Sequence, residues 1–140
     1  MTTRASRDQV WRVLSDGWLY PLWVVGATRM RDVDGHWPEP GARLHHSAGV
    51  WPAVTDDTTE VLESQPRESL VLRARGWPAG EAEVVVTLAD EGEGTRIDLE
   101  EDAVRGPGRL MPALARRPLI HVRNRESLRR LVLLAEGRAR

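Results

Sequence analysis

The last third of the chain restricts the fold most, because it reads as one long helix. Apolar residues recur along it at steps of three, four and seven, which places them on one face at about 3.6 residues per turn. They are Leu110, Leu114, Leu128, Leu131 and Ala135. A helix from Arg109 to Arg140 has to bury such a stripe against another layer, so the rest of the chain must supply that layer.

From Gly26 onward the apolar residues alternate with polar ones, the pattern of half-buried strands. Turn signals such as Asp34-Gly35 and the run 91–94 separate the alternating stretches and indicate hairpins. The predicted strands are Thr28–Val33, Arg43–Ala48, Thr58–Ser64, Ser69–Arg75, Glu81–Leu88 and Thr95–Val104. Their order predicts an antiparallel meander of about six strands.

Two short helices are predicted before the strands. Ser6 with Gln9 three residues later forms a capping box, and Asp16-Gly17 indicates the end of that helix. Pro21 near the start of residues 20–25 favours a second helical turn. The whole order predicts an α+β fold, a curved antiparallel sheet wrapped around the C-terminal helix, in one domain over residues 1–140.

Composition excludes several kinds of chemistry. The chain has no cysteine, which excludes disulfides, thiolate metal sites and a cysteine nucleophile. It has no lysine, which excludes Schiff-base chemistry and a Walker lysine. No apolar run approaches the roughly 18 residues of a membrane span, and the N-terminus lacks the apolar core of a signal peptide. The expected location is therefore the cytoplasm.

Positive charge is concentrated in the C-terminal helix. From Arg109 onward there are nine arginines against two glutamates, whereas the preceding residues carry an excess of acids. A basic helix can bind RNA or another macromolecule, which is one functional hypothesis. Most of these arginines lie off the apolar stripe, however, as they do on any solvated helix face.

Three polar residues interrupt the apolar stripe: Arg117, His121 and Asn124. A helix that only closes a core gains nothing from them, since burying an unpaired polar group costs about 1–3 kcal/mol. The hypothesis is that the C-terminal half of the helix seals the core while its middle lines a cavity, with these residues as ligand contacts.

Glu101 and His46 are the candidate catalytic residues. Glu101 follows Ile97 and Leu99 at a spacing of two, so it either points into an apolar interior, where it could act in acid–base chemistry, or lies at the mouth paired with an arginine. His45 and His46 are adjacent in a strand and must face opposite sides, with His46 inward. His46, Glu101 and His121 could converge on one cavity, but no spacing motif supports a metal site, and no cofactor is predicted.

Three Trp-Pro pairs fall at predicted strand ends or turns, at residues 37–38, 51–52 and 77–78. Aromatic side chains at a cavity rim can stack on a ligand, so Trp51 and Trp77 are candidate ligand contacts. Alternatively, each pair packs its own loop.

The chain resembles the SRPBCC superfamily (START-like, polyketide cyclase/dehydrase). Three stretches carry the likeness: residues 5–16, close to the family's opening helix; residues 23–52, which end in Gly49-Val50-Trp51-Pro52; and residues 101–108 followed by the helix ending at residues 131–136. The family usually begins with a full strand, whereas only Met1 to Arg4 precede the opening helix here.

The resemblance implies a helix-grip fold with a deep, largely apolar cavity between sheet and C-terminal helix. It implies binding of a hydrophobic small molecule, lipid or polyketide-like. Two alternatives remain: a cyclase/dehydrase-type enzyme using Glu101 and a histidine, and an RNA- or protein-interaction module using the arginine-rich helix. Fold alone does not select among them, and the oligomeric state is open.

Overall fold

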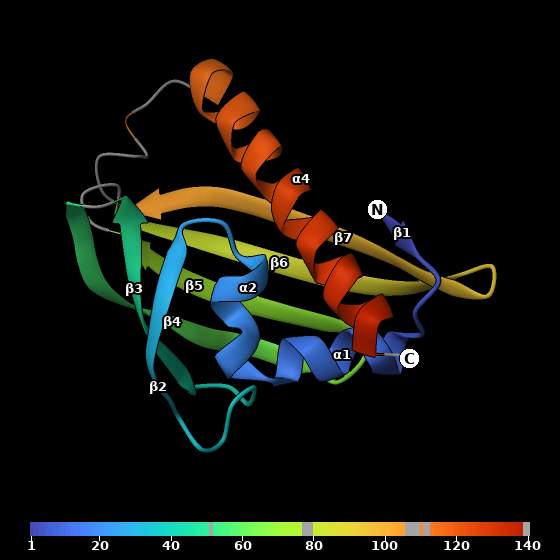
Figure 1. Cartoon of the computed structure of the whole chain (residues 1–140). Coiled ribbons are helices and arrows are strands. Elements are labelled where there is room, and N and C mark those ends of the chain that lie inside the picture. Colours follow the sequence, from blue (N-terminus) through green and yellow to red (C-terminus); the bar gives the residue numbers. More distant parts are fainter. Residues whose placement is uncertain (51, 77–79, 106–109, 111–112, 139–140) are drawn as a thin grey trace.

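A computed structural model of the chain describes residues 1–50, 52–76, 80–105, 110 and 113–138. Seven antiparallel strands form one curved sheet in the order β1-β7-β6-β5-β4-β3-β2, so consecutive strands from β2 to β7 are neighbours (Figure 1). The strands are β1 (Thr2–Thr3), β2 (Ala27–Val33), β3 (Arg43–Val50), β4 (Ala53–Gln65), β5 (Ser69–Gly76), β6 (Gly80–Glu91) and β7 (Gly94–Arg105). The helices are α1 (Arg7–Ser15), the 3-10 turn η1 (Gly17–Leu19), α2 (Tyr20–Trp23) and α4 (Ala113–Arg138).

The predicted α+β helix-grip architecture is confirmed, and the edge before the first helix is now defined. The six predicted strands are present, and β1 adds a two-residue seventh that pairs with β7 at Thr2↔Arg96 and Thr3↔Thr95. Gly94 permits this pairing, because a Cβ added there would lie 1.9 Å from the carbonyl oxygen of Thr3.

Strand β4 is longer than the sequence pattern indicated. The prediction started it at Thr58, whereas the structure starts it at Ala53. Its first residues resemble a turn in composition, but they pair with β3, and their polar side chains bond locally. Ser47 Oγ donates to Asp56 at 2.8 Å, and Thr55 Oγ1 donates to Asp57 at 3.2 Å. Strand pairing therefore overrode the low strand propensity of aspartate.

The second half of α4 seals the hydrophobic core. Leu131 and Ala135 are fully buried, and Ser127 Oγ accepts a hydrogen bond from the Val25 amide at 3.1 Å. Leu110 is 85% exposed, so its assignment to the buried stripe was wrong. Pro118 lies inside this helix, which continues past it to Arg138. Among the described residues, no helix is long and apolar enough to cross a membrane.

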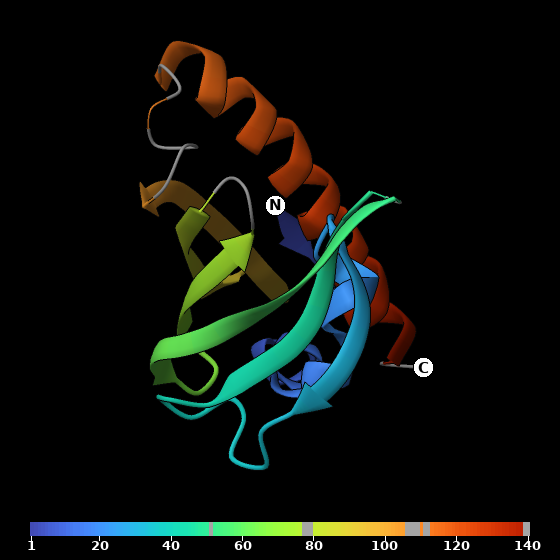
Figure 2. The same ribbon diagram turned by 90° about the vertical axis from the view of Figure 1, so that its left-hand side faces the viewer.

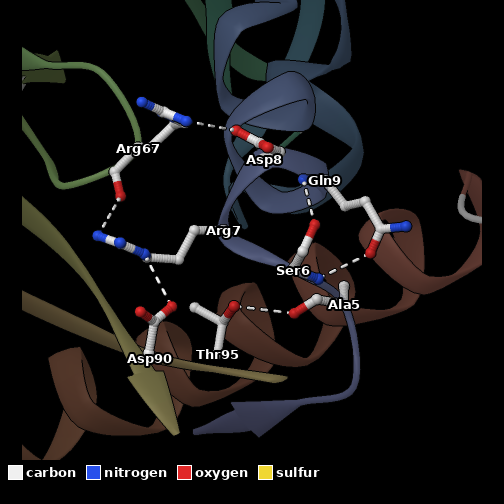
Figure 3. Close-up of polar contacts among 8 residues, drawn as sticks. All are labelled: Ala5, Ser6, Arg7, Asp8, Gln9, Arg67, Asp90 and Thr95. Carbon is white, nitrogen blue, oxygen red and sulfur yellow. Dashed lines mark hydrogen bonds and ion pairs between the residues drawn. The ribbon is translucent and has the colours of Figure 1, made fainter. Parts of the chain in front are cut away.

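Polar contacts fasten α1 to the end of the sheet (Figure 3). Ser6 and Gln9 form the predicted capping box. Arg7 forms an ion pair with Asp90 at 2.9 Å, and Thr95 Oγ1 donates to the carbonyl of Ala5 at 2.8 Å. These contacts hold α1 against β6 and β7, and α4 packs on α1 and β7.

Candidate functional site

The side chains on the inner face of the sheet, which the helices cover, change from buried to partly accessible along the strands. Directly paired residues share a face, so alternate residues of β5, β6 and β7 belong to it. At the end nearest α1 these side chains are large and buried: Leu70, Leu72, Val86, Leu88 and Ile97. Val84 and Leu99, which pair with Leu72 and Val86 midway along the strands, are only partly buried, and so are Ala74, Ala82 and Ala103 toward the opposite end. The helices therefore cover one end more completely than the other.

Small side chains form one row across the accessible end. Ala74 of β5 pairs with Ala82 of β6, and Ala82 pairs with Ala103 of β7. All three are partly accessible, and the row continues at Thr59 of β4, which pairs with Ala74. Three neighbouring methyl groups fill less space above the sheet than the leucine and valine side chains beside them.

A buried hydrogen-bonded group of three side chains continues this row. His46 Nε2 lies 2.8 Å from Thr59 Oγ1, and the Tyr20 hydroxyl lies 3.2 Å from the same oxygen. The Tyr20 and His46 rings are 5.4 Å apart, and Trp23 packs edge-on against Tyr20 at 5.6 Å. The three residues come from α2, β3 and β4, so only the folded chain brings them together.

His46 has an unsatisfied ring nitrogen. The residue is 3% exposed, and its Nδ1 atom makes no hydrogen bond to the described residues. Burial lowers the pKa of His46, whereas the nearby charge of Asp57 and the backbone of Ser47 oppose that shift; the approach to Ser47 does not have the geometry of a hydrogen bond. The ring is therefore neutral at neutral pH. If Nε2 donates its hydrogen to Thr59 Oγ1, Nδ1 is an acceptor, and if Nε2 accepts from Thr59, Nδ1 is a donor.

The lowered pKa of His46 predicts a defined pH dependence of stability. Below pH 6.5, the ordinary pKa of histidine, the unfolded chain binds a proton at His46 that the folded chain does not. The free energy of unfolding therefore decreases as the pH is lowered from 6.5 to the lowered pKa of the folded state. Asp34 and Glu126 contribute only further down, below their ordinary values of 3.8 and 4.5. We expect His46→Gln to flatten the slope of unfolding free energy between about pH 5 and 6.5.

Urea unfolding at a series of pH values measures this slope. Above about pH 7 the curves of the wild type and His46→Gln should run parallel, which serves as the internal control. Equal slopes below 6.5 would contradict the assignment.

Glu101 and Arg123 connect β7 to α4 at the accessible end. The Arg123 guanidinium donates to a carboxylate oxygen of Glu101, whose side chain is 8% exposed, against 42% for Arg123. Burial raises the pKa of Tyr20 to about 12; the hydrogen bond with Thr59 opposes this, and the charge of Glu101 adds to it. Tyr20 thus lies within electrostatic reach of the ion pair and keeps its proton at neutral pH.

Of the remaining candidate ligand contacts, the structure places one inside the fold and two on its surface, and two lie outside the described residues. Asn124 is 9% exposed and faces inward, whereas Arg117 and His121 are exposed on α4. Trp51 and Trp77 lie outside the described residues, so their role as ligand contacts stays a prediction. His45, on the outer side of β3, contacts Asp34 at 3.0 Å.

Sequence reasoning missed Tyr20, Thr59 and Arg123. Thr59 carried a weak signal, since it occupies an inward position of the strand predicted from Thr58. Tyr20 and Arg123 carried none, because nothing local distinguishes a buried tyrosine or a paired arginine.

Two other features lie apart from this group. No cluster of potential metal ligands occurs among the residues that the structure describes. A shallow groove of about 570 Å³ is lined by Trp18, Trp37, Arg12 and Asp34, among others, between the first helices and the connection from β2 to β3. Trp37 Nε1 donates to the Leu14 carbonyl at 3.1 Å, so this tryptophan holds the connection between β2 and β3 against α1.

Comparison with known proteins identifies relatives by family and fold. The profile of a family described as Activator of Hsp90 ATPase homolog 1-like protein matches residues 4–117. No curated protein matches the chain. Protein NE0264 from Nitrosomonas europaea has a TM-score of 0.75 and 18% identity, covering 99% of this chain and 92% of that one.

Two further solved structures share the fold. The di-domain ARO/CYC StfQ from the steffimycin biosynthetic pathway has a TM-score of 0.75 and 14% identity, covering 99% of this chain and 49% of that one, so this chain spans about half of StfQ. Ara h 8.0201 has a TM-score of 0.74 and 8% identity, covering 98% and 94%. At these identities the likeness concerns the fold alone.

Proposed function

The chain belongs to the family of Activator of Hsp90 ATPase homolog 1-like proteins, within the SRPBCC superfamily, and we propose that it binds a hydrophobic small molecule between the inner face of the sheet and α4. The observation that carries this proposal is the row Ala74, Ala82 and Ala103, three small and partly accessible side chains at an interior position. A core selected only for stability would fill that row with larger groups, because interiors pack at nearly crystalline density.

The polar side chains beside this row define which ligand fits. His46, whose Nδ1 atom has no hydrogen-bond partner among the described residues, lies beside Thr59 at one end of the row, and the Glu101–Arg123 ion pair lies at the β7 end. A ligand with an apolar body and a carbonyl or hydroxyl group would satisfy His46 while covering the alanines. The desolvation penalty of an unpaired buried nitrogen, about 1–3 kcal/mol, favours such a ligand group.

The positions of Glu101 and His46 favour binding over paired acid–base catalysis. They lie on β7 and β3, four inter-strand steps apart in the sheet. The ion pair also engages the Glu101 carboxylate. A carboxylate already held by an arginine, on a strand separated by three others from that of the histidine, favours contacts to two parts of one ligand over joint action on one reacting atom.

Filling the alanine row tests the proposal. We expect Ala82→Phe to lower ligand affinity at least about tenfold and to change the free energy of unfolding by less than about 1 kcal/mol, because the new ring occupies the ligand's space. Native mass spectrometry with solvent extraction identifies the ligand carried by the wild type. Tryptophan fluorescence, to which Trp23 beside Tyr20 contributes, then gives affinities.

The matched control is Thr87→Phe, which adds the same ring to the exposed outer face of β6. It should leave affinity unchanged. A wild-type protein that carries no ligand and responds to no member of a lipid and polyketide panel, together with an Ala82→Phe variant destabilised by about 1–3 kcal/mol, would mean that the row is already filled. That outcome would reject the proposal.

A further inference from the structure

The outer face of α4 carries apolar and basic residues that no other element covers. Counting along the helix, Leu119, Val122, Glu126, Arg129 and Leu133 follow at steps of three and four, so they share one face. Its apolar members are highly exposed: Leu119 is 67%, Val122 69% and Leu133 56% accessible. This face lies opposite the one that buries Leu131 and Ala135.

The first half of α4 also stands clear of the sheet. Figure 1 and Figure 2, from directions at right angles, both show its early turns rising away from the strands. The elements that α4 contacts are chiefly α1, α2, β7 and β1. The outer face is therefore sterically free to meet a flat surface.

Positive charge exceeds negative charge along this face, because Arg125 and Arg129 stand against the single acid Glu126. Arg125 is exposed beside Val122, and no ion pair links Arg125 to another residue in the described part of the chain. The one acid, Glu126, is already paired, with Arg130 at 2.9 Å and with Arg129 at 3.6 Å. The face thus combines exposed leucine and valine with net positive charge.

We propose that the outer face of α4 is a docking surface for an anionic lipid bilayer. Leucine and valine would enter the boundary between headgroups and acyl chains, while arginines reach the lipid phosphates, as on other amphipathic helices that lie in a membrane interface. A nucleic acid would pair the arginines but leave the apolar side chains unburied. A second copy of the same face would bring arginines against arginines. This inference rests on the outer face alone and is independent of what the inner face binds.

Vesicle flotation tests it. The wild type should bind vesicles of phosphatidylcholine with phosphatidylserine, should not bind pure phosphatidylcholine vesicles, and should release as salt rises. Leu119→Gln/Val122→Gln should weaken binding about tenfold or more, because it removes the inserted side chains. Arg125→Gln/Arg129→Gln should weaken it about tenfold as well, since each arginine contributes electrostatic attraction. All four positions are exposed, so the variants should keep the fold.

Matched controls are Leu22→Gln, 54% exposed on α2, and Arg12→Gln, exposed on α1, and neither should change binding. Failure of the wild type to bind phosphatidylserine vesicles at low salt would overturn the proposal. So would binding that survives Leu119→Gln/Val122→Gln. Tight binding of single-stranded RNA that is lost only in Arg125→Gln/Arg129→Gln would assign the face to nucleic acid and overturn it too.

Discussion

Replacing Leu131 by Ala is expected to lower the free energy of unfolding by about 2–5 kcal/mol. Leu131 is fully buried where the second half of α4 closes the core, so truncation removes apolar contacts and leaves a cavity that the surrounding strands and helices fill only in part. For a domain whose total stability is of the order of 5–15 kcal/mol, that is a large fraction. Urea unfolding, followed by tryptophan fluorescence, measures the difference.

The control for this substitution lies two residues further along the same helix. Leu133→Ala makes the same chemical change, with the same effect on helix propensity, at a position that is 56% exposed. It should alter stability by no more than about 0.5 kcal/mol. Similar losses in the two variants would mean that the buried face of α4 has been assigned to the wrong side.

Replacing Thr59 by Val is expected to destabilise the protein by about 2–4 kcal/mol, because one hydroxyl serves two buried partners. Valine has nearly the shape of threonine and suits a strand equally well, so packing is preserved. What is lost is the oxygen that lies 2.8 Å from His46 Nε2 and 3.2 Å from the Tyr20 hydroxyl. Both partners are then left buried without it. Thr58→Val, on the opposite face of β4, is the matched control and should be nearly neutral.

A double-mutant cycle separates this effect from general damage. Tyr20→Phe removes the hydroxyl that Thr59→Val leaves unsatisfied, so its own effect should be smaller in the Thr59→Val background than in the wild type. The coupling should exceed about 0.5 kcal/mol, the level at which independent sites cease to be additive. Additive losses would show that the Tyr20–Thr59 hydrogen bond contributes nothing to stability.

Much of the fold could be predicted because its elements carry local signals. Alternation marked the six strands, the Ser6–Gln9 spacing marked the start of α1, and helical spacing marked α4. The errors arose where a local signal competed with a distant contact. Thr55 to Asp57 look like a turn, yet they belong to β4 because β3 pairs with them. Leu110 fits the apolar stripe, yet it lies beyond the elements that could cover it.

The candidate site was predicted only in part, for a related reason. Sequence periodicity placed His46 and Glu101 on the inner face, since each occupies an alternate position in a strand. It could not identify their partners. Thr59 reaches His46 across a strand pair, Tyr20 arrives from α2, and Arg123 reaches Glu101 from α4.

By itself the amino-acid sequence determined the type and order of the elements, because strand and helix periodicities depend on residues a few positions apart. Only the tertiary structure decided which residues meet and which faces stay uncovered. Thr3 and Thr95 became neighbours through strand pairing, and the alanines of three strands fell into one row through register. Leu131 and Leu133 are the same residue two positions apart on α4, but the first is fully buried and the second is exposed, because burial depends on which side of the helix meets the sheet and the short helices.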